Sequence, residues 1–198
     1  MRPQAENSSV VFGCAVFKAE ILALKERYWP DLDIRFLNSM LHMVPDELGS
    51  RLDKLIQKEV SSDHNILLVY GDCCPQMETL TEHPGVIRVR GNNCCDLLLG
   101  RQMYRRLSHE GAFFLFPEWA GRWQHIFRVE LGLNAANAAS LMKDMHKKLV
   151  YLDTGFFPVP VEDLEACSLY CQLPWEVLAV SLEPLRECIQ TAFDQFKR

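Results

Sequence analysis

Residues 66–74 read Ile-Leu-Leu-Val-Tyr-Gly-Asp-Cys-Cys. The continuous apolar run that ends at a glycine is typical of a strand buried on both faces of a parallel sheet. Two adjacent cysteines, Cys73 and Cys74, follow the run within three residues. The stretch therefore predicts a buried strand that delivers thiols at its carboxyl end.

Two other strand-like runs follow the same plan. Residues 10–13 lead to Cys14, and residues 86–91 lead, after two asparagines, to Cys94 and Cys95. Because parallel strands end at the same edge of a sheet, cysteines that are far apart in the sequence can meet there. This arrangement predicts a soft-metal or thiolate site.

Strand-like and helix-like segments alternate along the chain. Strands are predicted at residues 10–16, 33–38, 65–70, 86–89, 112–116, 148–152 and 176–181. Helices are predicted at residues 19–28, 45–60, 76–82, 96–107, 119–131, 137–147 and 161–170, and over the final segment. The repeated units predict an α/β fold: an open, mostly parallel sheet with helices on both faces, Rossmann-like and doubly wound. A chain of 198 residues is too short for a (β/α)₈ barrel and shows no linker, so residues 1–198 are expected to form a single α/β domain.

Composition excludes several classes of protein. The eight cysteines are too few for a disulfide scaffold, and a domain of this size can bury an ordinary core without disulfides. The formal charge of −5 argues against a nucleic-acid-binding domain. Neither a signal peptide nor an apolar run long enough to span a membrane is evident, so a cytoplasmic, reducing location is expected.

Polar and sulfur-bearing side chains concentrate where the predicted strands end, which is where open α/β sheets bind ligands. The predicted strands deliver Cys14, then His42, then Asp72 with Cys73 and Cys74, then Asn93 with Cys94 and Cys95, and finally Trp119 and Asp153. Thiolates select zinc, copper(I) or iron–sulfur clusters, and a helix N-terminus after each strand would lower a thiol pKa. Cys14, one cysteine of each adjacent pair and His42 would make a four-ligand set.

Other interpretations of the cysteines stay open. Free cysteine often behaves as a small buried hydrophobe, and the spacing here is not that of a zinc ribbon or a ferredoxin. Cys167 and Cys171 lie four residues apart on a predicted helix, where they could pack, bind a metal or form a redox pair. No glycine-rich phosphate loop and no nucleophile elbow is present.

The segments Tyr70-Gly71-Asp72-Cys73, Cys95 to Gly100 and Pro117-Glu118-Trp119 together resemble an uncharacterised domain-of-unknown-function family of methanogens and anaerobic bacteria. The resemblance covers roughly residues 11 to 155 and places Cys14, His42, Cys73 and Cys95 at the family's cysteine and histidine positions. This chain departs from the family by doubling the cysteines. Family members often occur near corrinoid methyl-transfer systems, so the resemblance implies a corrinoid protein or a methyltransferase as partner.

The leading hypothesis is a cytoplasmic metal–thiolate protein in methyl-transfer, corrinoid or metallocofactor metabolism. Its zinc or iron–sulfur cluster would be held by Cys14, His42, Cys73 and Cys95, with Cys74 and Cys94 as alternates. Asp72 and Asn93 would orient these ligands, and Trp119 would form a wall of the cofactor pocket. The alternatives are a metal-free module that binds a corrinoid or porphyrin at the strand ends, and a thiol–disulfide enzyme.

Overall fold

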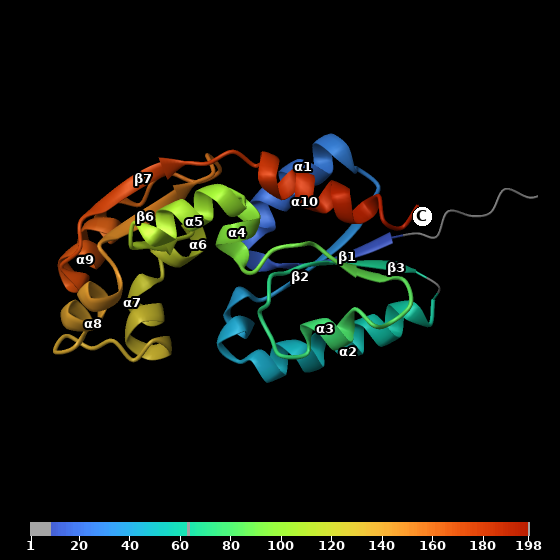
Figure 1. Cartoon of the computed structure of the whole chain (residues 1–198), viewed down its shortest axis with the longest axis horizontal. Helices are drawn as coiled ribbons and strands as arrows, with labels where there is room; N and C mark the ends of the chain where they lie inside the picture. Colours follow the sequence, from blue (N-terminus) through green and yellow to red (C-terminus); the bar gives the residue numbers. More distant parts are fainter. Residues whose placement is uncertain (1–8, 63, 198) are drawn as a thin grey trace, which may run out of the picture. The chain divides into compact units, whose positions relative to one another are not determined.

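The structure is a computed structural model that describes residues 9–62 and 64–197 (Figure 1). Their contacts divide them into two compact units. Unit 1 contains the described residues up to Leu97 and those from Glu183 onward, and unit 2 contains Leu98–Leu182. Unit 2 is thus an insertion between two segments of unit 1.

Unit 1 contains a four-stranded parallel sheet in the order β2-β1-β3-β4. Its strands are β1 Ser9–Cys14, β2 Asp33–Leu37, β3 Asn65–Val69 and β4 Val86–Arg88. Its helical elements are η1 Ala15–Phe17, α1 Lys18–Tyr28, η2 Ser39–Met43, α2 Pro45–Val60, α3 Met77–Leu80, the start of α4 Cys94–Leu99, and α10 Glu183–Phe193.

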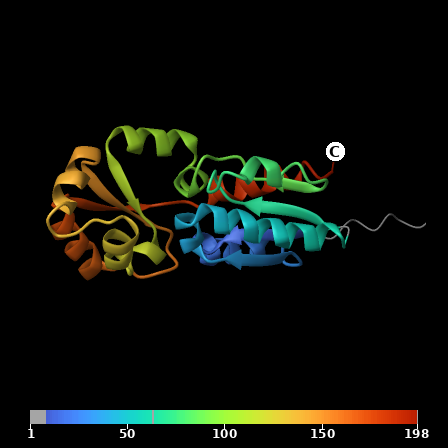
Figure 2. The ribbon, with the colours of Figure 1, turned by 90° about the horizontal axis from the view of Figure 1, so that it is seen from below.

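Helices cover both faces of this sheet. In Figures 1 and 2, α1 and α10 lie on one face and α2 and α3 on the other. The longest of them, α2, begins with Pro45 in its first turn, followed by two acidic residues that suit a helix N-terminus. Leu48, Leu52 and Ile56 recur at helical spacing on α2 and are all at most 1% exposed. The apolar stripe of α2 therefore packs into the core, as its sequence predicted.

Unit 2 contains a three-stranded parallel sheet in the order β5-β6-β7. Its strands are β5 Ala112–Leu115, β6 Lys148–Asp153 and β7 Trp175–Ala179. Its helical elements, after the end of α4, are α5 Arg101–His109, α6 Pro117–Ala120, α7 Trp123–His125, the π-helical turn η3 Ile126–Glu130, α8 Ala138–Met145 and α9 Val161–Cys171. Helices α5, α6 and α9 contact β5, β6 and β7, respectively.

The predicted α/β class with parallel strands and covering helices is confirmed. The strands form two sheets, however, where one was expected, because hydrophobic periodicity carries no information on which strands pair. The helix predicted at residues 96–107 is two helices, since Gly100 adopts a positive φ of 74° between α4 and α5. The single domain stays a prediction. Within the described residues, no helix is both long and apolar enough to cross a membrane.

Candidate functional site

The carboxyl edge of the unit 1 sheet contains the topological switch point between β1 and β3. The chain runs from β1 to β2 on one side of β1, then returns to β3 on its other side. Loops diverge at such a point, which is where open α/β sheets bind ligands. Cys14 is the last residue of β1, and Cys73 lies in the loop that follows β3. The fold therefore places these two cysteines on either side of the expected crevice.

The loop after β3 is joined to the loop after β4 through backbone atoms. The N–H of Asp72 donates to the carbonyl oxygen of Asn92 at 2.8 Å. Gly71 makes this approach possible, because a Cβ atom there would lie 2.5 Å from the Cα of Asn93 and 2.8 Å from the Asn92 oxygen. Any side chain at position 71 would force the loops apart.

The start of α4 fixes the direction of Cys94. Asn93 precedes the helix, and its Oδ1 accepts from the N–H of Asp96 at 2.9 Å, as an N-cap side chain does. The Asp96 carboxylate, only 5% exposed, accepts in turn from the N–H of Asn92 at 2.9 Å. Asn93 thus caps the helix that begins with Cys94, and its predicted role in orienting a ligand stays a prediction.

Three thiols, those of Cys14, Cys73 and Cys94, are in contact. The Cys94 thiol forms hydrogen bonds with both Cys14 and Cys73. Cys14 ends β1, Cys73 lies in the loop after β3, and Cys94 begins α4 after β4. We refer to them as the thiol cluster. The sequence favoured Cys95 as the ligand from this segment, whereas the thiol in the cluster is that of Cys94, its alternate.

The shared hydrogen bonds move the pKa values of the cluster in opposite directions. The pKa of Cys73 is lowered, chiefly because the Cys94 thiol donates a hydrogen bond to it. The pKa of Cys94 is raised well above its usual value, because its proton is held between Cys14 and Cys73 and because the sulfur is buried. Cys73 is therefore the member that most readily becomes a thiolate.

Arg88 spans the two loops and stabilises negative charge at Cys73. Its Nη2 lies 2.8 Å from Oδ1 of Asp72, and its Nη1 lies 3.5 Å from the carbonyl oxygens of Tyr70 and Gly91. The positive charge of Arg88 lowers the pKa of Cys73, after the larger effects of Cys94 and a backbone hydrogen bond at Gly71. Asp72 thus acts through an ion pair with Arg88, a partner that sequence reasoning missed.

His42 lies on η2, the turn after β2, and β2 neighbours β1 in the sheet. Its Nδ1 is 2.5 Å from the carbonyl oxygen of Ser39. A carbonyl oxygen can only accept, so Nδ1 carries the proton and Nε2 has the lone pair in the neutral ring. Histidines that bind metals through Nε2 have this arrangement.

The other predicted cysteines have different surroundings. Cys74 is 7% exposed, and burial raises its pKa. Burial raises the pKa of Cys95 to about 12, with a smaller effect from Asp96. Cys188, on α10, donates to the carbonyl oxygen of Arg90 at 3.8 Å. Whether Cys74 or Cys95 binds a ligand stays a prediction.

Unit 2 contains the remaining predicted residues. Trp119 lies on α6, where its ring packs edge-on against Phe116 at 5.6 Å between centroids. Its role as a pocket wall stays a prediction. Cys167 and Cys171 lie on α9, are fully buried and form a hydrogen bond with each other. Asp153, at the end of β6, accepts from the N–H of Gly155 at 2.9 Å in a local turn.

Among residues 9–62 and 64–197, no group of three or more His, Cys, Asp or Glu side chains has the arrangement of a ready metal site. The thiols are held by S–H···S contacts, and a metal ion would have to replace these contacts by metal–sulfur bonds. Zinc with Zn–S bonds of about 2.3 Å places its sulfur atoms roughly 3.8 Å apart, which is near the contact distance of two sulfur atoms. Thiol sulfur is the donor type that thiophilic ions prefer.

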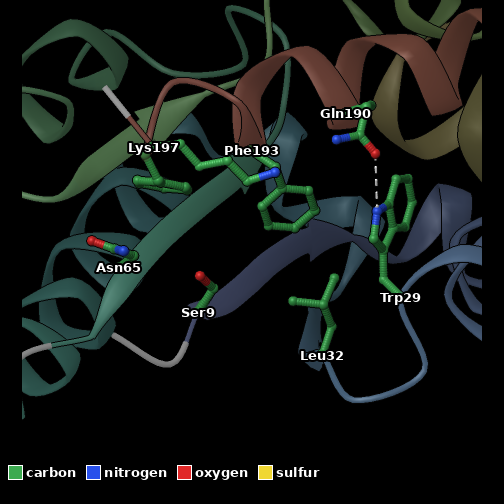
Figure 3. A pocket seen from close by; sticks show the side chains of 8 residues that line it. Ser9, Trp29, Leu32, Asn65, Gln190, Phe193 and Lys197 are labelled. Atoms are coloured by element: carbon green, nitrogen blue, oxygen red, sulfur yellow. Dashed lines mark hydrogen bonds between the residues drawn. The ribbon is translucent and has the colours of Figure 1, made fainter. Parts of the chain in front are cut away.

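A pocket of about 570 Å³ lies at the opposite edge of the unit 1 sheet. Figure 3 shows Ser9 and Asn65, which open β1 and β3, together with Trp29 and Phe193 around it. The Trp29 indole donates to Oε1 of Gln190 at 3.2 Å. Because it lies at the amino ends of the strands, this pocket differs from the predicted strand-end cofactor pocket.

Residues 36–189 match a family described as "Protein of unknown function (DUF1638)". Neither the curated proteins nor the solved structures gave a match to the chain.

Proposed function

The chain belongs to the DUF1638 family of proteins of unknown function, and we propose that it binds a thiophilic metal ion through Cys14, Cys73 and Cys94. The observation that carries the proposal is the contact of three thiols from the carboxyl ends of three strand segments at a topological switch point. Thiolate sulfur prefers zinc, copper(I) and iron–sulfur clusters over hard cations.

Zinc is the ion that we propose first, with His42 as the fourth ligand. The Nδ1 atom of His42 bonds to the Ser39 carbonyl oxygen, so Nε2 is the nitrogen that would bind the metal, and three sulfurs with one imidazole form a common tetrahedral zinc set. Each thiol that becomes a ligand releases one proton. Cys94 and Arg88 favour this release at Cys73 because both lower its pKa. An iron–sulfur cluster is the alternative occupant of the same thiols.

Methyl-transfer, corrinoid or metallocofactor metabolism is the cellular role that we propose for this site. Bound zinc would supply one chemistry: it keeps a substrate thiol in the nucleophilic thiolate form. The link to corrinoid systems comes from the sequence resemblance, and a corrinoid protein or methyltransferase is the partner that follows from it.

The experiment is a determination of metal and sulfide in protein purified without oxygen, together with its absorption spectrum. We expect one zinc per chain in a colourless protein. Iron with acid-labile sulfide and a broad visible absorption would identify a cluster instead. A protein that takes up neither zinc nor iron, even after reconstitution, would refute the proposal.

Variants test the assignment of the ligands. Cys94→Ser should lose most of the bound metal, because Cys94 contacts both of the other thiols. Cys188→Ser is the matched control, since Cys188 is in the same unit and bonds to the Arg90 carbonyl. If Cys94→Ser keeps as much metal as the Cys188→Ser control, the ion binds elsewhere.

One further observation favours thiol–disulfide exchange as a second candidate function. Cys73 and Cys94 are in contact, and the pKa of Cys73 is lowered while that of Cys94 is raised, as in dithiol oxidoreductases. The Cys73 thiolate would attack a substrate disulfide and release one substrate thiol. The Cys94 thiolate would then attack the mixed disulfide, release the second thiol and leave a Cys73–Cys94 disulfide. A Cys73–Cys94 disulfide that forms reversibly in glutathione buffers, detected as a cross-linked peptide, would support this function. If this disulfide does not form, the function is excluded.

A further inference from the structure

Tyr70 has a buried hydroxyl group without a hydrogen-bond partner. The side chain is 2% exposed, and its Oη has no partner in the part of the chain that the structure describes. A buried polar atom left unpaired destabilises a protein, so each such atom needs an explanation. An unpaired hydroxyl next to a ligand site is explained if the ligand, when bound, supplies the missing partner.

The sheet directs Tyr70 toward the thiol cluster. Val69 pairs with Gly13 in the register of β3 and β1, so the next residues, Tyr70 and Cys14, stand side by side. Side chains at paired positions of parallel strands point to the same face. The phenol interacts electrostatically with Cys14, Cys73, Cys94 and Cys74, in that order of strength. Tyr70 therefore lies at the end of β3 beside the thiol cluster, and its buried hydroxyl is without a partner in the described structure.

We propose that the Tyr70 hydroxyl is a hydrogen-bond donor to the sulfur of a metal-bound thiolate in the thiol cluster. The inference rests on the proposed function, because it requires the thiols to lose their protons to a metal. A neutral thiol is a weak acceptor, and its own proton is already shared within the cluster. A thiolate is a charged acceptor, and a hydrogen bond to it is stronger than a neutral one.

The phenol remains a donor when the site is loaded. A phenol has an ordinary pKa of about 10. Tyr70 thus keeps its proton at neutral pH and does not compete with the cysteines as an anionic ligand. It is a positioning residue that stabilises the loaded state of the site and leaves the empty state with an unpaired group.

This role gives Tyr70→Phe opposite effects on two measurable properties. The substitution removes only the hydroxyl, so the metal-free protein should be as stable as the wild type or more stable, because an unpaired buried group is gone. The metal-loaded protein loses a charge-assisted hydrogen bond, and the affinity for the ion should fall by roughly 10- to 100-fold. A purely structural tyrosine would not produce this combination.

The test titrates Co²⁺ and Cd²⁺ into the metal-free full-length chain without oxygen. Wild type, Tyr70→Phe and Tyr151→Phe are compared by competition with a chelator, by urea unfolding and by the sulfur-to-cobalt charge-transfer band. Tyr151 is the matched control, because it is a 1% exposed strand tyrosine that lies in unit 2. We expect weaker binding and a shifted band in Tyr70→Phe alone.

The outcomes separate the two proposals. If the wild type binds neither ion, the proposed function fails. If the wild type binds and Tyr70→Phe binds equally well with the same band, the proposed function stands and the role of Tyr70 is refuted. Loss of stability in metal-free Tyr70→Phe with unchanged affinity would also refute it, because the hydroxyl would then have a partner, such as a water molecule, in the empty site.

Discussion

The N–H of Asp72 donates a 2.8 Å hydrogen bond to the carbonyl oxygen of Asn92, and this contact determines which thiols of the two loops meet. Cys73 follows Asp72 directly, and Cys94 lies two residues after Asn92. Pairing of the backbones at this point brings their thiols into contact. The geometry of the thiol cluster therefore depends on a main-chain contact that a side chain at position 71 would prevent.

Gly71→Ala should disrupt both the fold and the thiol cluster. The three atoms nearest to the added Cβ are backbone atoms, at 2.5 Å (Cα of Asn93), 2.7 Å (N of Asn93) and 2.8 Å (the Asn92 oxygen). Backbone cannot move aside as a flexible side chain can, so we expect a loss of about 1–3 kcal/mol in the free energy of unfolding. Urea unfolding measures this loss, and bound metal should fall with it.

Gly121→Ala is the control for this substitution. Gly121 has φ −70° and ψ −7°, and no atom lies within 4 Å of the position that its Cβ would take. The change in its unfolding free energy should stay within about 0.5 kcal/mol. Equal losses in the two variants would contradict the steric explanation.

Cys73 should react with iodoacetamide faster than Cys14 and Cys74. It is partly exposed and its pKa is lowered, whereas the other two are each 7% exposed. Arg88→Ala removes a positive charge that favours the Cys73 thiolate, so the pH profile of alkylation should move to higher pH. Peptide mass spectrometry over a series of pH values gives the rate for each cysteine.

Arg90→Ala serves as the matched charge control. Arg90 lies two residues beyond Arg88, and its side chain is exposed to solvent. Its removal should leave the Cys73 profile unchanged, because exposed charges are screened by water and salt. The same upward shift in both variants would mean that net charge, and not the contact of Arg88, controls the thiol.

Hydrophobic pattern was sufficient to predict the α/β class and the edge at which the thiols meet. Residues 66–69 are all fully buried, as expected of a central parallel strand. The sequence did not show which of Cys94 and Cys95 joins the thiol cluster. That depends on the exact start of α4, where Asn93 caps the helix. The strand order could not be predicted either, since apolar runs do not specify which strands are neighbours.

Tyr70 shows why one important site residue was missed. In the sequence it is the last apolar position of a strand, next to a glycine. Its proposed role comes from the register of β1 and β3, which pairs the preceding residue, Val69, with Gly13, the residue before Cys14, and pairing register is a tertiary property. The one feature of the sequence that could have indicated Tyr70 is its position directly before Gly71-Asp72-Cys73-Cys74.

The cysteines of α9 should resist alkylation in the native protein. The pKa of Cys171 is lowered because the Cys167 thiol donates to it, which by itself would favour reaction. Both residues are fully buried, however, and a reagent reaches them only when the structure opens. We expect alkylation of Cys167 and Cys171 to begin only at urea concentrations that unfold the protein. Cys188, which is partly exposed, is the comparison and should react in the native protein. Native-state modification at the rate of Cys73 would show that access is not limiting.

Glu59 connects α2 to β2 through a buried carboxylate. Its Oε1 accepts from Arg35 at 2.6 Å and its Oε2 lies 2.8 Å from Nδ1 of His64, while the side chain is only 5% exposed. These hydrogen bonds, that of Arg35 first, lower the pKa of Glu59. A carboxylate with a lowered pKa stabilises the folded state above its unfolded pKa of about 4.3, and this contribution is lost as the pH falls through the folded value.

Glu59→Gln should therefore cost about 1–3 kcal/mol of unfolding free energy at pH 7, because the ion pair with Arg35 is lost and one of the two acceptor oxygens becomes an NH2 group that cannot accept. The difference in unfolding free energy between wild type and variant should narrow below about pH 4.3, where protonation of Glu59 removes the same charge from the wild type. Urea unfolding at pH 7 and pH 3 measures both gaps. Glu47→Gln, at an exposed pair with Arg51, should cost at most about 1 kcal/mol. A gap for Glu59→Gln that widens in acid would mean that the carboxylate does not stabilise the fold through its charge.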